Sequence, residues 1–136
     1  MLRVVLSAMY SSGWVGMAFS RDGMMVGSSA MVGWIGKKGQ SHIKQFALNG
    51  KAPQLVVADR GFLVSNSGDH TVLVEQAKIY LAFQLKFPSP LKQQQVLFAF
   101  GSAIPVNDRL AVHQDMTSMN FDFTTGESPH SLLLTI

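Results

Sequence analysis

The sequence predicts an all-β protein folded as an antiparallel β-sandwich, and two observations carry this prediction. Short stretches rich in Val, Ile, Phe and Thr recur along the chain and are separated by turns rich in Gly and Ser. One of these stretches alternates strictly between apolar and polar residues. The 136 residues are 47% hydrophobic and 14% charged, a composition typical of one globular domain with a real core.

The clearest strand is "KIYLAFQLKF", residues 78–87. Apolar side chains occupy every second position, as in a strand that is buried on one face only. The predicted core face consists of Ile79, Leu81, Phe83, Leu85 and Phe87. The other face carries Lys78, Tyr80, Ala82, Gln84 and Lys86.

Seven further stretches have the same strand character, and turn signals fall between them. They are residues 2–8, 13–20, 28–35, 42–48, 70–76, 95–101 and 119–125. Turns are predicted at residues 11–13, 21–23, 36–39, 49–53 and 66–69. Residues 102–118 lack a strand period and are long for a hairpin, so they predict an irregular loop of the kind that often carries a site.

Composition argues against several classes of function. The formal net charge of +3 is spread over the chain, with no basic run longer than Lys37-Lys38, so nucleic acid is not an expected partner. The absence of cysteine excludes disulfides, cysteine zinc sites and thiol nucleophiles. No stretch approaches the roughly 20 apolar residues of a membrane-spanning helix, and residues 1–13 do not resemble a signal peptide.

Among the residues that could form a functional site, the methionines are the strongest candidates. No nucleophile elbow is present, and the glycines of "GWIGKKG" lead from strand to strand, not into a phosphate-binding helix. The four histidines are not spaced as pairs, which disfavours a metal cage built from them alone. Eight methionines remain, of which four lie close together: Met17, Met24, Met25 and Met31. Methionine usually fills gaps in a core, but its thioether can also ligate haem iron or copper.

The stretch "GWVGMAFSRDGMMVGSSAMVGWIGKKGQ", followed by "YLAFQLKF", "VLFAFG" and "LAVHQDMTSMNFDFTTG", resembles a DOMON domain of the plant cytochrome b-561 and DOMON domain-containing type. The resemblance runs from about Leu2 to Gly126, which leaves residues 127–136 as a C-terminal tail. Its most specific part is the Gly-x-Met-x-Gly-Ser pattern at Gly23 to Ser28. The resemblance implies an immunoglobulin-like, two-sheet sandwich that holds haem b between a methionine and a histidine, matching Met25 and His113 here.

On this resemblance the chain is expected to be an electron carrier, not an enzyme. A thioether paired with imidazole leaves no open position on iron, and a glycine-rich turn lets backbone approach a flat macrocycle. Met24 is then expected to face the opposite way, as a packing or surface residue. Alternation suggests four wall residues for the haem pocket: Phe19, Trp34, Phe98 and Phe100. The implied partners are ascorbate or a membrane cytochrome, and the implied location is extracellular or membrane-associated.

Two departures from the family keep other interpretations open. The domain, residues 1–126, is expected to be N-terminally incomplete, which would leave an unpaired sheet edge, and the chain is expected to be without the transmembrane cytochrome part. A haem-free module that recognises a carbohydrate or a protein partner is the alternative function. A non-functional truncated product is the third interpretation.

Overall fold

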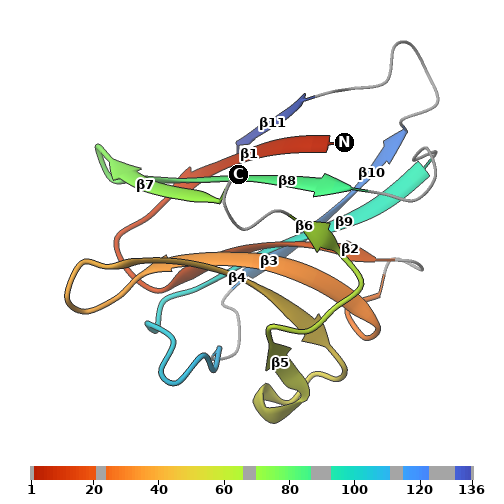
Figure 1. The fold of residues 1–136 in the computed structure, drawn as a ribbon, viewed down its shortest axis with the longest axis horizontal. Coiled ribbons are helices and arrows are strands. Elements are labelled where there is room, and N and C mark those ends of the chain that lie inside the picture. The colour runs from red at the N-terminus through yellow and green to blue at the C-terminus, as the bar shows by residue number, and fades with distance from the viewer. Residues whose placement is uncertain are drawn as a thin grey trace.

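The computed structural model folds into two β-sheets that pack face to face (Figure 1). The structure describes residues 2–20, 24–65, 70–86, 93–110, 115–122 and 131–135. Within these ranges the only helical element is a single 3-10 turn, η1 (Pro53–Leu55). The predicted all-β sandwich is therefore confirmed.

The first sheet has five strands, with β1 and β8 at its centre. Its strands are β1 (Leu2–Met9), β6 (Val64–Ser65), β7 (Thr71–Glu75), β8 (Lys78–Lys86) and β11 (Ser131–Thr135). Strand β1 lies between β8 and β11, while β6 and β7 both pair with β8. Because β11 runs parallel to β1, this sheet is mixed and not wholly antiparallel. Residues 131–135, expected to lie in a tail outside the domain, are thus part of the sandwich.

The second sheet has six strands, all antiparallel to their neighbours. Its spatial order is β10 (Asp115–Asp122), β9 (Gln93–Gly101), β2 (Trp14–Ser20), β3 (Ser28–Ile35), β4 (Ser41–Leu48) and β5 (Val56–Ala58). Strands β2 and β3 are buried on both faces, which explains why their sequences are almost continuously apolar or small.

Each of the eight predicted strands overlaps a strand of the structure. The largest difference is in the strand predicted at residues 119–125, which begins at Asp115, while residues 87 and 123–125 of the predicted strands lie outside the described residues. Three short strands, β5, β6 and β11, were missed because two to five residues carry too little periodicity. The predicted loop over residues 102–118 ends earlier than expected. Asp115 already pairs with Phe100 across β10 and β9, so backbone pairing with a long neighbour overrides the weak local pattern.

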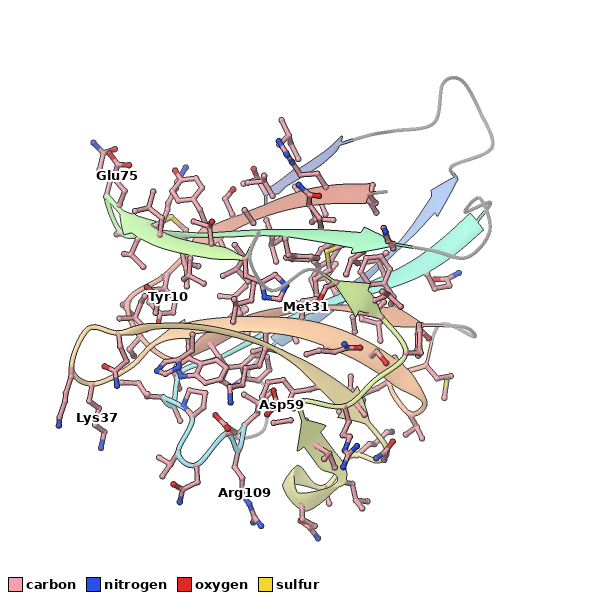
Figure 2. All side chains as sticks on the ribbon, in the orientation of Figure 1. Tyr10, Met31, Lys37, Asp59, Glu75 and Arg109 are labelled. Atoms are coloured by element: carbon pink, nitrogen blue, oxygen red, sulfur yellow. The ribbon has the colours of Figure 1, made fainter. Side chains whose placement is uncertain are left out.

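The main core lies between the two sheets. Four of the predicted core residues of β8 are almost completely buried there: Ile79, Leu81, Phe83 and Leu85. The fifth, Phe87, lies outside the described residues. Met31 on β3 is part of the same core, and Figure 2 shows it between the sheets. We call the side of the six-stranded sheet that faces this core its inner face.

A second apolar cluster covers the opposite side of the six-stranded sheet, which we call its outer face. Members from the sheet are Trp14, Ala18, Ala30, Val32, Trp34, Phe46, Leu48, Val56 and Leu97. Ile104 and Leu110 pack onto it from the segment that follows β9, and Met25 packs onto it from the β2–β3 turn. The six-stranded sheet therefore has apolar layers on both faces, and only the inner one is closed by a second sheet.

Side chains of the inner face also hold the chain where it crosses between the sheets. After β5 the chain runs to β6, and Gln45 on β4 exchanges two hydrogen bonds with the backbone of Leu63, at 3.0 and 2.9 Å. The Phe62 backbone N–H donates to Oγ of Ser29 at 3.0 Å. These contacts replace the strand neighbour that this part of the chain lacks.

Candidate functional site

The two adjacent methionines lie in the turn that joins β2 to β3. The backbone N–H of Ser28 donates to the carbonyl oxygen of Met25 at 3.1 Å, closing a β-turn over residues 25–28. Gly27, at the third position, has a φ of +87°, as a type II turn requires. A Cβ placed on Gly27 would meet no heavy atom within 4 Å, so the glycine is needed for its backbone conformation alone.

Three strands hold this turn in place. The Ser28 hydroxyl, at the start of β3, donates to the Met25 carbonyl oxygen at 2.6 Å. The Ser20 hydroxyl, at the end of β2, donates to the Met24 carbonyl oxygen at 2.7 Å. The Gly27 N–H donates to the carbonyl oxygen of Leu48 on β4 at 2.8 Å. The backbone around Met25 is therefore fixed from three directions.

The two methionine side chains have different surroundings. Met24 is 59% exposed, whereas Met25 is partly buried against the outer-face cluster. The hydrogen bonds of the turn fix the backbone, while the unbranched Met25 side chain remains free to adapt to what it touches. Of the two thioethers, that of Met25 is the one placed over the apolar outer face.

The outer face next to Met25 is made of small side chains. Strand register brings Ala18 on β2 opposite Ala30 on β3, and the next outer-face position of β2 is Gly16. Ala99 on β9 lies opposite Gly16 and continues this region. We call Gly16, Ala18, Ala30 and Ala99 the alanine strip. Larger side chains border the strip, and Phe46 on β4 separates it from Ala58 on β5.

The far end of the outer face is aromatic. Trp34 on β3 stacks on His42 of β4 with ring centroids 5.1 Å apart and an interplanar angle of 19°, and its centroid lies 6.3 Å from that of Phe46. Met25 lies near Leu48 at the opposite end of β4. Six residues separate Leu48 from His42, which is about 20 Å along a strand. His42 is therefore too far from Met25 for the two side chains to bind one iron.

Residues 102–110 pass over the outer face and include a tight hairpin. The Arg109 N–H donates to the Val106 carbonyl oxygen at 3.0 Å, and Asn107 and Asp108 both have positive φ, of 52° and 58°. These are the features of a type I′ turn, in which Asn and Asp are favoured residues. Figure 2 shows Arg109 on the outer side of the six-stranded sheet, away from the second sheet.

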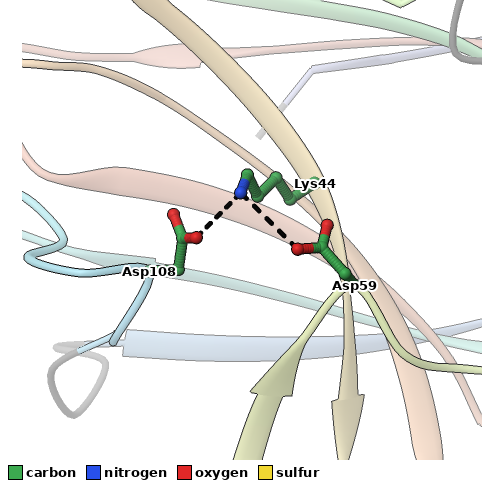
Figure 3. A network of polar contacts seen from close by, with 3 residues as sticks. All are labelled: Lys44, Asp59 and Asp108. Carbon is green, nitrogen blue, oxygen red and sulfur yellow. Dashed lines mark hydrogen bonds and ion pairs between the residues drawn. The ribbon is translucent and has the colours of Figure 1, made fainter.

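An ion-pair network attaches this hairpin to the sheet (Figure 3). Nζ of Lys44 on β4 lies 2.8 Å from Oδ2 of Asp108 and 3.6 Å from Oδ2 of Asp59, which follows β5. The hydrogen bond with Asp108 is the main cause that raises the pKa of Lys44. All three side chains are partly exposed, so the network adds modest stability but fixes the position of the hairpin.

The predicted wall residues do not share one surface. Phe19 and Phe98 belong to the core between the sheets, whereas Trp34 belongs to the outer face. Phe100 is 42% exposed. On β9 it is Leu97 and Ala99 that lie on the outer face with Met25. When a strand is buried on both faces, its odd-numbered and even-numbered residues are similarly apolar. The sequence therefore could not show which of them face outward.

The predicted second ligand, His113, lies outside the described residues. Within the described ranges, no three His, Asp or Glu side chains come together in a way that could hold a metal ion. The same ranges contain no helix with the length and apolar character needed to cross a membrane.

The structure thus defines a β-sandwich module with a loop-covered second apolar layer. The chain is 42% identical over 135 residues to a cytochrome b561 and DOMON domain-containing protein of Arabidopsis thaliana, and 37% identical over 140 residues to a second one. The matches cover 98% and 95% of this chain but 34% and 37% of the relatives, so the chain spans about a third of their length.

No family model and no solved structure matches the chain. The two similarities to the Arabidopsis proteins nevertheless confirm the resemblance that the residues around Gly23 to Ser28 indicated. The chain is a DOMON-type module related to the cytochrome b561 and DOMON domain-containing proteins.

Proposed function

We propose that this module binds one haem b on the outer face of its six-stranded sheet, with Met25 and His113 as axial ligands, and carries single electrons. The observation that carries the proposal is the placement of Met25. Its backbone is fixed by three strands, and its thioether lies beside a strip of small side chains on an apolar face. Met24 lies in the same hydrogen-bonded turn, but its side chain is 59% exposed and so lacks the second feature.

The residues present fit a planar, largely apolar macrocycle. Alanine and glycine on three neighbouring strands allow close approach to the sheet, and the bordering Trp34, Leu97 and Leu110 exclude water. Bound haem would supply a one-electron iron couple, and a Met/His ligand pair favours electron transfer over oxygen chemistry. The chain itself makes and breaks no bond in this proposal, so it is an electron carrier and not an enzyme.

The chain connectivity is compatible with His113 as the second ligand. His113 follows Leu110, which is buried on the outer face, by three residues, and precedes Asp115, which pairs with Phe100, by two. Among the wall residues expected from alternation, we retain Trp34 and add Leu97 and Ala99, because these lie on the outer face.

The physiological setting belongs to the same proposal. We expect the electron donor or acceptor to be ascorbate or a membrane cytochrome, and the location to be extracellular or membrane-associated. Mixing the oxidised, haem-loaded protein with ascorbate and following the reduction of the haem in the absorption spectrum tests the first part. Lack of any ascorbate-dependent reduction would leave the membrane cytochrome as the proposed donor.

The experiment for haem binding is an absorption spectrum of the purified chain after haem reconstitution. We expect a six-coordinate, low-spin spectrum, because two strong-field ligands fill both axial positions. His113→Ala removes the stronger bond and abolishes most of the haem affinity. Met25→Leu makes the haem five-coordinate, and Met25→His retains it with a lower reduction potential.

Met24→Leu is the control, since it replaces an exposed neighbour by an apolar residue of similar volume and leaves the spectrum unchanged. A spectrum altered by Met24→Leu and not by Met25→Leu would exchange the roles of the two residues. If wild type shows no bound haem, the haem proposal is wrong. The haem-free module that binds a carbohydrate or a protein would then take its place.

A further inference from the structure

We infer that Ser28 is a positioning residue for Met25, and that its hydroxyl group sets how tightly the Met25 thioether binds iron. This inference rests on the proposed function, in which Met25 is a ligand. Methionine has three rotatable side-chain bonds, so the fixed backbone of Met25 is what limits the range of positions that its sulfur can reach. We therefore expect the contacts of the Met25 backbone to contribute to the strength of a weak thioether ligand.

Ser28 supplies two of those contacts. Its backbone N–H and its hydroxyl both donate to the same Met25 carbonyl oxygen, at 3.1 and 2.6 Å. Ser28 is 2% exposed, so no bulk water replaces the hydroxyl when it is removed. Because Met25 lies in an irregular turn, its carbonyl oxygen has no strand partner that could take over.

The neighbouring residue Ser29 provides a matched control. It is 1% exposed, its side chain lies on the inner face, and its oxygen accepts a hydrogen bond from Phe62. Ser28→Ala and Ser29→Ala each remove one buried, hydrogen-bonded hydroxyl from adjacent positions of β3. Only Ser28→Ala removes a contact with the Met25 turn.

The experiment measures the apparent affinity of the ferric, haem-loaded protein for imidazole, which competes with the thioether for iron. The net contribution of one hydrogen bond corresponds to about a twofold to tenfold effect, so we expect Ser28→Ala to bind imidazole more tightly by that factor. Ser29→Ala should bind imidazole as wild type does, although urea unfolding shows that both variants lose stability. Ser28→Thr, which keeps the hydroxyl, should restore the wild-type affinity.

A second pair of variants guards against a general folding effect. Gly27 and Gly39 both have positive φ, of +87° and +82°, and a Cβ on either would meet no atom within 4 Å. Replacement by alanine strains both turns equally, but Gly39 lies in the distant β3–β4 hairpin. Gly27→Ala should raise the imidazole affinity and the high-spin fraction, and Gly39→Ala should change neither.

The outcomes separate this inference from the proposed function. If Met25→Leu leaves the imidazole affinity unchanged, Met25 is not a ligand and both proposals are wrong. If Met25→Leu raises the affinity but Ser28→Ala behaves like Ser29→Ala, Met25 is a ligand and the positioning role of Ser28 is wrong. The inference is supported if imidazole binds most tightly to Met25→Leu, less tightly to Ser28→Ala, and least tightly to Ser29→Ala and wild type, which should be equal.

Discussion

The inner and outer faces of the six-stranded sheet are both apolar, but they are closed in different ways. The inner face packs against a second sheet, and its members include Met17, Phe19, Met31 and Phe98, which are almost completely buried. The outer face combines tryptophans with alanines and is covered by a turn, a hairpin and an ion-pair network. The inner face is thus closed by extensive apolar packing between two sheets, whereas the segments that cover the outer face are held by a smaller number of polar and apolar contacts.

This difference assigns the two faces to different tasks. A core between two sheets stabilises the fold because its close packing tolerates neither gaps nor extra volume. A face under loops costs less to open locally, as a site that admits a ligand requires. The contrast predicts that substitutions in the core between the sheets mainly lower the unfolding free energy, whereas matched substitutions on the outer face mainly weaken haem binding.

The largest expected effect is in the core between the two sheets. Phe83 and Phe46 are both almost completely buried, one in the core between the sheets and one on the outer face. Phe83→Ala should cost about 3–5 kcal/mol of unfolding free energy, because the walls of the cavity cannot collapse. Phe46→Ala should lower the unfolding free energy by less, because the covering loops can settle into the space. It should also weaken haem binding, because Phe46 lies on the proposed haem surface. Equal losses in urea titrations, without any change in haem affinity, would contradict the contrast.

A smaller effect is expected from adding volume to each face. A Cβ on Gly33 would overlap the end of the Leu81 side chain from the opposite sheet, whereas a Cβ on Gly16 would lie 3.1 Å from Cγ2 of Val32. Gly33→Ala should therefore cost about 1–3 kcal/mol, and Gly16→Ala should stay within about 1 kcal/mol of wild type.

Haem binding should show the reverse order for these two glycines. Gly16 belongs to the alanine strip on the proposed haem surface, so an added methyl group there reduces the close approach. Haem titrations and urea unfolding of the same two variants measure both effects. If Gly33→Ala weakens haem binding more than Gly16→Ala does, at equal folded fraction, the proposal that haem binds to the outer face is wrong.

The same contrast explains how far the sequence could predict the structure. Strand β8 has one solvent-facing side, so its alternation identified Ile79 and Phe83 as core residues correctly. Strands β2 and β3 are buried on both sides, and β9 is buried on both sides at its centre, so alternation could not tell which set faces outward. Phe19 and Phe98 were therefore assigned to the pocket although they lie between the sheets.

The turn at Met25 was easier to predict from the sequence than the residues that form the wall of the haem pocket. The glycine-rich segment around the two methionines indicates a turn from local chemistry alone, and the structure has a β-turn at residues 25–28. The bounds given for the predicted turn, residues 21–23, lie outside the described residues. The network of Lys44, Asp59 and Asp108 could not be predicted, because its members come from three segments that only the fold brings together. Strand β11 was missed because its five residues carry too little periodicity, and its pairing with β1 at the other end of the chain gives no local signal.

The smallest expected effect is on the loop-covered outer face, where Lys44→Met removes the cation that holds the Asp108 hairpin. The pKa of Lys44 is raised above its ordinary 10.5, mainly by the hydrogen bond with Asp108. A raised pKa means that the folded state binds the proton more tightly, so the stabilisation is complete below pH 10.5 and is lost as the pH rises through the higher folded-state value. Because the three side chains are partly exposed, Lys44→Met should lower the unfolding free energy at pH 7 by less than about 1 kcal/mol.

The control for this prediction is Lys37→Met, at the exposed tip of the β3–β4 hairpin, where Lys37 forms no ion pair with any residue that the structure describes. Urea titrations of wild type and both variants at pH 7 and above pH 11 make the comparison. The difference between wild type and Lys44→Met should shrink at the higher pH, and it should shrink at high salt too, because salt screens partly exposed charges. A difference that stays constant with pH and salt would contradict a role for the ion pair. The apolar contacts of Ile104 and Leu110 with the outer face would then hold the hairpin.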